Sequence, residues 1–367
     1  MKNVLSIVSY PFLPAKIGGQ KAIALFYSYF SKQVNLLCIT TKNNDSSEAK
    51  GYTVLPVLSN SKLRYINIFY LFPLRKLIRQ QSISTILIEH PYYSWLAILL
   101  SKTTNTTYII RSHNIESLRF KEMGKWWWRI LWQYEKIGHR LASHNFFITE
   151  EDKDFAIANF KLSPEKCTTI TYGFELTNKP TIEEKKIARE FLCKTHNISP
   201  EKKILLFNGA LDYAPNAQAI DAIIEQIIPR LNKQSFSYKI IICGRNLPER
   251  FNGLKNIPEI IFAGFVDDVS IYFKGADIFI NPVIEGGGIK TKLVEAIGAN
   301  LSAVSTRRGA IGIPTSVTQN KLIIVDDNNW DAFTSEIIAT DINLPTPESF
   351  YEYFYWESIA KKALSVL

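Results

Sequence analysis

The chain has 367 residues, of which 46% are hydrophobic and 13% aromatic, values that predict folded domains and exclude a disordered or low-complexity protein. Its four cysteines are widely spaced and form no C-x-x-C pair, which argues against a disulfide or zinc framework. Residues 1–180 hold 23 Lys or Arg and 12 Asp or Glu, a net charge of +11, whereas the remainder has a net charge of −2. The first half is therefore expected to face something anionic, the alternative being a basic solvated surface.

The beginning of the chain predicts a buried strand rather than a secretory signal. The apolar run over residues 2–8 is short and leads directly into a Pro/Gly loop. No apolar stretch approaches the roughly 18–20 residues that cross a bilayer. We therefore expect a cytoplasmic protein that is soluble, or at most peripheral on the inner face of the cell membrane.

Short β-branched runs alternate with segments of helical periodicity, which is typical of βαβ units and parallel sheets. Strands are predicted over 2–8, 34–39, 52–57, 84–89, 107–111, 145–149, 204–207, 239–243, 259–262, 277–280, 301–305 and 321–325. These are too many for one compact domain, so we predict an α/β chain with an N-terminal domain over 1–178 and a second domain over 179–345. A helix over about 183–195 is expected between them. The C-terminal helix, 346–367, is expected to pack back toward the N-terminal domain.

Polar residues follow several predicted strands of the first domain, and in parallel sheets ligands bind beyond the carboxyl ends of strands. Gly18 and Gly19 come between the first strand and a predicted helix. His90 follows the fourth strand, where it either lines an acceptor site or belongs to a Pro-initiated helix with aromatic packing. The fifth strand is followed by the cluster Arg111-Ser112-His113-Asn114-Ile115-Glu116. Such a density of polar groups at a strand end predicts an active-site loop.

A helix predicted over about 119–142 contains the run Lys125-Trp126-Trp127-Trp128-Arg129. Consecutive helical residues are about 100° apart, so these tryptophans cannot all join one core stripe. The expected core stripe is Phe120, Met123, Trp127, Leu131 or Ile130, Tyr134 and Ile137. Two explanations stay open for the remaining tryptophans: docking at a membrane interface or lipid-linked acceptor, or broad burial under the C-terminal aromatic helix.

The strongest motif follows the strand predicted over 277–280, where Glu285-Gly286-Gly287-Gly288-Ile289-Lys290 leads into a helix. Consecutive glycines let the backbone approach a ligand and adopt positive φ. The helix N-terminus favours phosphate oxygens, and Lys290 and Lys292 add positive charge there. Glu295, about one turn further on, is placed to accept hydrogen bonds from ribose hydroxyls. We therefore predict a nucleotide-diphosphate site; the alternative is a flexible loop before an ordinary basic helix.

The stretch from Phe207 to Pro314 resembles the donor-binding half of GT-B glycosyltransferases, and specifically retaining glycosyltransferase family 4. The matching pieces are Phe207–Asn216, Cys243-Gly244-Arg245, Gly264-Phe265-Val266-Asp267-Asp268, Gly286–Glu295 and Ser305–Ala310. The resemblance implies the GT-B fold, in which two Rossmann-like, doubly wound parallel-sheet domains face each other across a cleft.

The same resemblance implies roles for individual residues. Donor-binding residues would be Gly18, Gly19, Gly209, Arg245, Phe265, Val266, Gly286, Gly287, Gly288, Ile289, Lys290, Lys292 and Glu295. Glu295 would be the final glutamate of the family's E-x7-E motif. His113 would lie beside the transferred sugar and hold hydroxyls, not act as a nucleophile; a loop histidine satisfied by backbone is the alternative. His90, Arg111 and Asn114 would lie on the acceptor side.

This sequence departs from the family pattern in two places. Gly287 occupies the position of the first glutamate of E-x7-E, and Glu285, two residues earlier, is the expected catalytic substitute. The usual Arg and Lys after the first strand of the donor domain are absent around Gly209–Asn216. Lys290 or Lys292 is therefore expected to neutralise the diphosphate.

The implied reaction moves a hexosyl or related sugar from a nucleotide diphosphate to a hydroxyl of a glycan or lipid-linked glycan, with retention. Thr149 with Asp152 predicts a helix cap rather than a metal-binding Asp-x-Asp, and we expect no metal or other cofactor. The implied setting is polysaccharide or lipopolysaccharide biosynthesis. An anionic membrane surface is a candidate partner of the basic N-terminal domain, whereas no motif indicates nucleic acid.

Two other functions remain open from the sequence. One is a sugar-nucleotide epimerase of the same fold, which would convert the donor without an acceptor. The other is a non-catalytic subunit that binds a sugar nucleotide or a partner, which the missing first glutamate permits.

Overall fold

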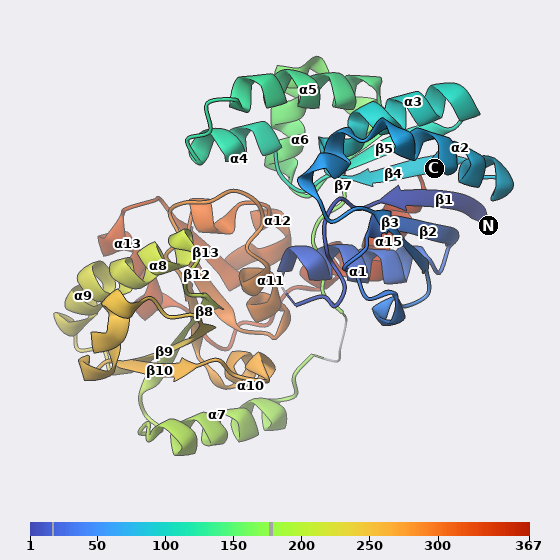
Figure 1. The fold of residues 1–367 in the computed structure, drawn as a ribbon. Helices are drawn as coiled ribbons and strands as arrows, with labels where there is room; N and C mark the ends of the chain where they lie inside the picture. The colour runs from blue at the N-terminus through green and yellow to red at the C-terminus, as the bar shows by residue number, and fades with distance from the viewer. Residues whose placement is uncertain (17, 176–178) are drawn as a thin grey trace. The chain divides into compact units, whose positions relative to one another are not determined.

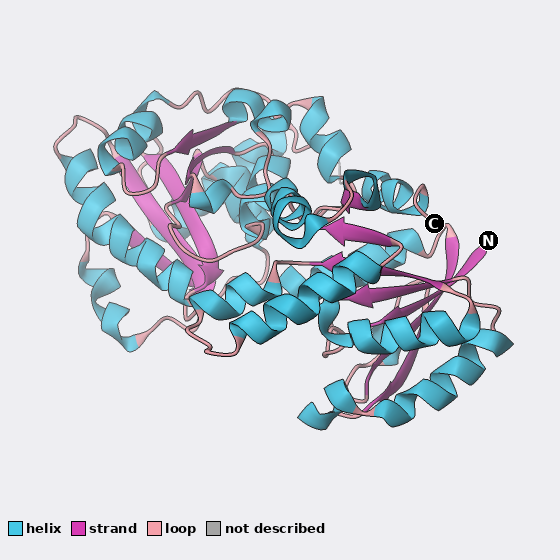
Figure 2. Cartoon of the chain, turned by 90° about the horizontal axis from the view of Figure 1, so that it is seen from above, coloured by secondary structure: helices cyan, strands magenta, loops and turns pink. Residues whose placement is uncertain are grey.

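The computed structural model describes residues 1–16, 18–175 and 179–367. The chain forms two compact units: Met1–Glu175 together with Phe354–Leu367, and a second unit that ends at Tyr353. In each unit helices surround a parallel sheet (Figures 1 and 2). The predicted α/β chain with two parallel sheets is confirmed. The predicted boundary at residue 178 and Ile17 of the first Pro/Gly loop lie outside the described residues.

The sheet of the first unit has the strand order β3-β2-β1-β4-β5-β6-β7, and all neighbours pair in parallel. Its strands are β1 (Lys2–Ile7), β2 (Val34–Thr41), β3 (Thr53–Leu58), β4 (Thr85–Glu89), β5 (Thr107–Ser112), β6 (His144–Phe147) and β7 (Cys167–Thr169). Every residue of β4 is buried, as expected for a parallel strand covered on both faces. The strand order reverses between β1 and β4, which makes the loops after these strands the natural ligand site.

Helices α1 to α6 connect these strands. Their bounds are α1 (Gly18–Phe30), α2 (Leu71–Gln80), α3 (Ser94–Thr104), α4 (Glu116–Glu122), α5 (Trp128–Leu141) and α6 (Glu150–Ala156). The N-cap predicted on Thr149 is confirmed, because its Oγ1 accepts the amide of Asp152 at 3.1 Å. No helix of the described residues is long and apolar enough to span a membrane.

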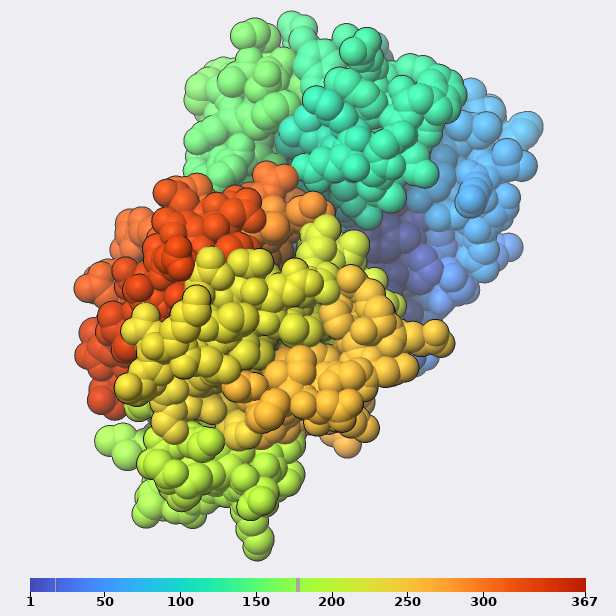
Figure 3. Space-filling view, turned by 90° about the vertical axis from the view of Figure 1, so that its left-hand side faces the viewer, coloured from blue at the N-terminus to red at the C-terminus, as the bar shows by residue number. Residues whose placement is uncertain are grey.

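The sheet of the second unit has the order β10-β9-β8-β11-β12-β13 and is also parallel. Its strands are β8 (Lys203–Ala210), β9 (Tyr238–Arg245), β10 (Ile260–Gly264), β11 (Ile278–Asn281), β12 (Ser302–Thr306) and β13 (Leu322–Val325). Its helices are α7 (Ile182–His196), α8 (Ala214–Ala222), α9 (Ile228–Asn232), α10 (Val269–Gly275), α11 (Thr291–Gly298), α12 (Thr315–Thr318), α13 (Trp330–Ala339) and α14 (Glu348–Phe354). The yellow-green α7 lies on the surface beside the orange segment that includes α10 (Figure 3). The order reverses between β8 and β11, so the loops after these two strands meet at the switch point.

Two predicted helices are interrupted. The helix expected over 119–142 is two helices, α4 and α5, because the chain turns at Gly124, whose φ of 69° is left-handed. Met123 and Ile137 are consequently exposed and do not belong to the expected core stripe. The C-terminal segment is likewise two helices, α14 and α15 (Trp356–Leu364), with extended backbone at the N-cap residue Tyr355.

Helix α15 belongs to the first unit, where it packs on α1. Trp356 is fully buried, and its ring meets that of Tyr172 edge-on with centroids 5.6 Å apart. The amide of Phe174 donates to the carbonyl of Phe354 at 2.9 Å. Trp126 is 82% exposed, so burial of the whole tryptophan run under the C-terminal helix is wrong.

Candidate active site

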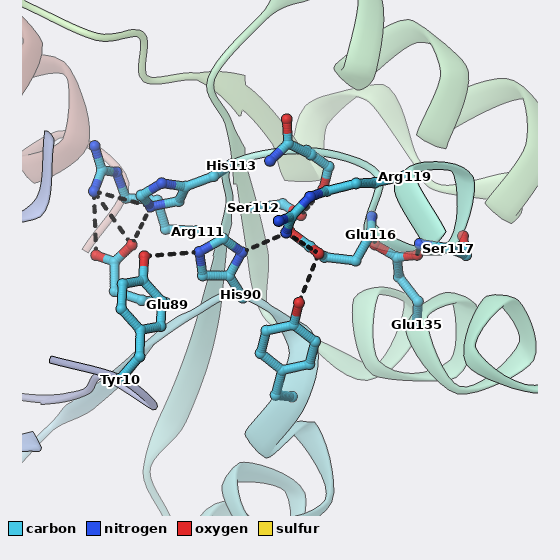
Figure 4. A network of polar contacts seen from close by, with 12 residues as sticks. Tyr10, Glu89, His90, Arg111, Ser112, His113, Glu116, Ser117, Arg119 and Glu135 are labelled. Atoms are coloured by element: carbon cyan, nitrogen blue, oxygen red, sulfur yellow. Dashed lines mark hydrogen bonds and ion pairs between the residues drawn. The ribbon is translucent and has the colours of Figure 1, made fainter. Parts of the chain in front are cut away.

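One candidate site lies in the first unit, where β4 and β5 end side by side. Glu89 and Arg111 are register partners of the two strands and both are fully buried. The Nη1 atom of Arg111 lies 3.2 Å from each carboxylate oxygen of Glu89 (Figure 4), and its guanidinium stacks 4.2 Å from the ring centre of Phe26. Buried charges persist only when paired, so this ion pair fixes the position of the Glu89 carboxylate.

His113 follows β5 and is held by the same carboxylate. Its Nε2 lies 2.6 Å from Oε2 of Glu89, and its side chain keeps 10% exposure. Burial and the nearby His90 lower the pKa of His113 to about 4, although Glu89 opposes the shift. Burial would raise the pKa of Glu89, but Arg111 and His113 lower it to about 2. At neutral pH a neutral imidazole thus donates from Nε2 to a carboxylate, which leaves Nδ1 as a hydrogen-bond acceptor.

A second histidine is held in the opposite tautomer. The Nδ1 atom of His90 lies 2.9 Å from Oε1 of Glu116, while the hydroxyl of Tyr10 lies 3.0 Å from Nε2. Because a carboxylate only accepts, Nδ1 carries the proton and Nε2 accepts from Tyr10. The rings of His90 and His113 stack with centroids 4.4 Å apart. His90 has a φ of 63°, a strained conformation for a residue with a Cβ that typically persists at functional sites.

The carboxylate of Glu116 is itself fixed by several partners (Figure 4). Tyr92 donates to its Oε2 at 2.6 Å, and Arg119 lies 3.2 Å from the same oxygen. Burial alone would raise the pKa of Glu116, but the contacts with His90, Tyr92 and Arg119 lower it to about 2. Buried Glu135 of α5 accepts the amides of Glu116 and Ser117 at 2.9 Å, which anchors the start of α4.

The structure brings the predicted His90, Arg111 and His113 into one network. Arg111, expected on the acceptor side, is fully buried and contacts Glu89. Asn114 is half-buried, and its carbonyl accepts from Ser112 at 2.9 Å. The glycines Gly18 and Gly19 form the first turn of α1.

From the sequence, Glu116 lies in the predicted active-site loop, but neither it nor Glu89, Tyr10 or Tyr92 was singled out for a role of its own. A usable signal existed for Glu89 and Glu116. Each is an acidic residue within four positions of a histidine at the end of a strand, and the two strands are neighbours in the sheet. Tyr10 and Tyr92 carry no such signal.

A separate candidate site, in the second unit, is the glycine-rich loop between β11 and α11, at the switch point of the second sheet. Gly286 and Gly288 have φ values of 80° and 69°, which L-residues with a side chain rarely adopt. A Cβ on Gly286 would lie 3.0 Å from the hydroxyl of Tyr213 and 3.1 Å from Pro215, both in the connection after β8. Gly286 is therefore favoured by both backbone conformation and close packing, and Gly288 by backbone conformation.

The cations of this loop have defined partners. Lys290 Nζ donates to the carbonyls of Gly286, Gly287 and Gly288 at 2.9, 3.2 and 3.0 Å, so it shapes the loop. Lys292 Nζ lies 2.7 Å from Oε2 of Glu295 on the next turn of α11. Two of the predicted donor-binding residues, Lys292 and Glu295, are thus paired with each other on α11.

Other predicted residues end or follow neighbouring strands. Arg245 is the exposed last residue of β9, and Gly209 lies against Asn216 at the end of β8. Phe265 and Val266 follow β10 after the left-handed Gly264, and Phe265 is exposed.

Glu285 and Gly287 are exposed, whereas Ile289 is half-buried. Asn300, two residues after α11, has a left-handed φ of 61°, a conformation that Asn tolerates.

The described residues contain no group of three or more His, Cys, Asp or Glu side chains that would hold a metal ion. The second unit carries the cationic side chains of Arg245, Lys290 and Lys292, together with the amides at the start of α11. Such groups stabilise phosphate oxygens and a departing diphosphate.

Known proteins resemble both halves of the chain. The family model described as Glycosyltransferase Family 4 matches residues 20–178, and the model described as Glycosyl transferases group 1 matches residues 202–340. A curated relative, chitobiosyldiphosphodolichol beta-mannosyltransferase of Debaryomyces hansenii, is 23% identical over 276 residues. This alignment covers 66% of the chain and only 56% of that relative.

Solved structures share the fold at low identity. A glycosyltransferase from Rickettsia africae is 15% identical with a TM-score of 0.70, and 100% of this chain and 97% of that chain are covered. Anabaena HepE in complex with UDP is 13% identical with a TM-score of 0.72, and both chains are fully covered. The family matches to both halves and this shared two-sheet architecture show that the chain belongs to the GT-B glycosyltransferases.

Proposed function

We propose that the chain transfers a hexosyl or related sugar from a nucleotide-diphosphate donor to an acceptor hydroxyl, with retention at the anomeric carbon. The observation that carries the proposal is the glycine-rich loop at the switch point of the second sheet, followed by Lys292 and Glu295 on α11. Helix amides and cations suit a diphosphate, and a carboxylate suits ribose hydroxyls. That HepE has been seen with UDP and with UDP-glucose supports this class of donor.

The proposed chemistry requires no nucleophilic side chain. The bond from the anomeric carbon to the diphosphate oxygen breaks, a bond to the acceptor oxygen forms, and the proton of the acceptor hydroxyl passes to the departing diphosphate. Arg245, Lys292 and the amides of α11 stabilise the charge that develops on the diphosphate. His113 accepts a hydrogen bond from a sugar hydroxyl through Nδ1, which positions the sugar. No metal ion takes part in this scheme, so chelation by EDTA is expected to leave the rate unchanged.

The acceptor we propose is a lipid-linked glycan. The name of the Debaryomyces relative denotes mannosyl transfer to a diphosphodolichol-linked chitobiose, and a net charge of +11 over residues 1–180 suits an anionic lipid environment.

A donor screen followed by variants tests the function. Thermal shift against UDP-, GDP-, ADP- and dTDP-sugars should reveal one stabilising class, because a ligand that binds the folded state raises Tm. Glu295→Ala should remove most of that shift and His113→Ala most of the transfer, while Glu352→Ala, an exposed site on α14, should change neither. Donor binding without hydrolysis or transfer to any acceptor would indicate a non-catalytic subunit. Conversion of the donor without an acceptor would indicate an epimerase.

A further inference from the structure

An exposed apolar surface lies on the first unit between β3 and β4. It comprises η2 (Lys62–Ile66), η3 (Ile68–Tyr70) and α2, and is called the Lys62–Arg79 surface below. Its large apolar side chains point to solvent: Leu63 is 69% exposed, Ile66 75%, Ile68 54%, Phe69 74% and Phe72 66%. Scattered single exposures are ordinary, but five within ten consecutive residues indicate an interaction surface.

The charge of this surface is of one sign. Between Glu48 and Glu89 the sequence contains no Asp or Glu but six basic residues, Lys50, Lys62, Arg64, Arg75, Lys76 and Arg79. In α2 the exposed Phe72, Lys76 and Arg79 are spaced by four and three residues and so share one helix face. Leu74 and Ile78 are buried on the other side.

The surface is fixed to the polar network of the candidate site. Arg64 Nε donates to the carbonyl of Ser9 at 2.9 Å, and Trp95 Nε1 donates to the carbonyl of Tyr65 at 2.8 Å. The Tyr65 ring packs 5.7 Å from that of Tyr92, the residue that donates to Glu116. The segment is therefore held by its inner side while its apolar side chains face outward.

We propose that the Lys62–Arg79 surface docks on an anionic lipid bilayer, with Phe and Ile side chains below the headgroups and Lys and Arg on the lipid phosphates. The inference rests on the proposed function and deepens it, since docking next to the His113 network brings that network to an acceptor anchored in the bilayer. A second copy of the chain is a poorer occupant, because a two-fold interface would place this acid-free surface against itself.

Vesicle co-sedimentation of the full chain tests the proposal. Addition of phosphatidylglycerol to phosphatidylcholine vesicles should increase binding at low salt. Phe69→Ser with Phe72→Ser should weaken binding by about tenfold or more, the scale expected when two large apolar side chains leave the interface. Lys62→Gln with Lys76→Gln should weaken it by about fivefold per lysine and reduce its salt dependence. Ile182→Ser with Ile187→Ser removes two exposed apolar side chains of α7 and should change nothing.

Three outcomes would overturn the proposal. The proposal is rejected if the wild-type protein does not bind anionic vesicles. It is also rejected if binding survives the Phe69/Phe72 change but is lost with Trp126→Ser. A wild-type dimer that the Phe69/Phe72 change converts to monomers would assign the surface to self-association. Donor hydrolysis or transfer to an acceptor, measured in detergent-free buffer, is the separate readout for the proposed function. The absence of both in the wild-type protein rejects the proposed glycosyl transfer and leaves vesicle binding as an independent result.

Discussion

The two units build their candidate sites by opposite means. In the first unit, buried charged side chains hold one another: Arg111 fixes Glu89, and Glu89 fixes His113. In the second unit, backbone conformation forms the site, with left-handed glycines and an exposed Arg245. We therefore expect activity to be sensitive, in the first unit, to substitution of side chains that do not touch a substrate. In the second unit it should be sensitive to substitutions that change the backbone conformation.

The largest expected effect comes from the Glu89–His113 pair. His113→Ala should lower kcat by about 100-fold, the scale of a lost positioning contact, and Glu89→Gln by about tenfold or more, since the imidazole loses its anchor. The double variant should be no slower than His113→Ala, because Glu89 acts through His113. Steady-state kinetics of the four proteins measure this coupling.

Donor affinity is the control for this cycle. The residues proposed to bind the nucleotide, Lys292 and Glu295, belong to the second unit, so all variants should bind the donor nucleotide like wild type if they are folded. Independent, additive losses in the cycle would contradict the positioning role of Glu89.

The second expected effect distinguishes the roles of Glu285 in the glycine-rich loop and Glu295 on α11. Glu295→Gln should raise KM for the donor by about tenfold, because a hydrogen bond to a charged group contributes roughly 1.5–3 kcal/mol. Glu285→Gln tests the expected substitute for the missing motif glutamate and should lower kcat with a smaller effect on KM. If Glu285→Gln leaves both constants unchanged, the exposed Glu285 has no part in the reaction.

The third effect tests the backbone of the second unit. Gly286→Ala forces a side chain into a φ of 80° and against Tyr213, and should cost ~1–2 kcal/mol, or about tenfold in donor affinity. Gly287→Ala is the matched control, because Gly287 is not among the glycines of positive φ. Calorimetric titration with the donor nucleotide compares them, and equal losses would show that φ does not decide affinity.

The smallest expected effect is that of pH on the first unit. The neutral form of His113 is the hydrogen-bond acceptor, and its pKa is lowered to about 4. Activity should therefore fall only when the pH approaches about 4 and Nδ1 becomes protonated, and kcat/KM should change by less than about twofold around pH 6.5. An acidic limb with its midpoint at the ordinary histidine pKa would show that His113 is not buried as described.

Most of the fold could be predicted because parallel strands are continuous β-branched runs. All twelve predicted strands correspond to strands of the structure, with ends that differ by a few residues. The strand β7 was missed because Cys167–Thr169 has only three residues and no apolar run. The break between α4 and α5 was missed because helical periodicity continues across Gly124, and only its φ reveals the turn.

The sequence could predict candidate-site residues that directly follow strands, but not which side chains pair with one another. His113 and the loop Glu285–Lys290 could be placed, since each follows a recognisable strand. The pairing of Glu89 with His113 depends on β4 and β5 being neighbouring strands in register. No local sequence pattern predicts that register. The pKa shifts depend on burial, and burial of charged residues is the feature that hydrophobic periodicity describes least.

The position of α15 bears on how the protein is made. This helix packs on α1 of the first unit, yet it follows the entire second unit in the sequence. The second unit is therefore synthesised before Trp356 can pack against Tyr172. The first unit completes its core last, although its strands emerge first, so nascent chains arrested before residue 356 should expose apolar surface on α1 to chaperones.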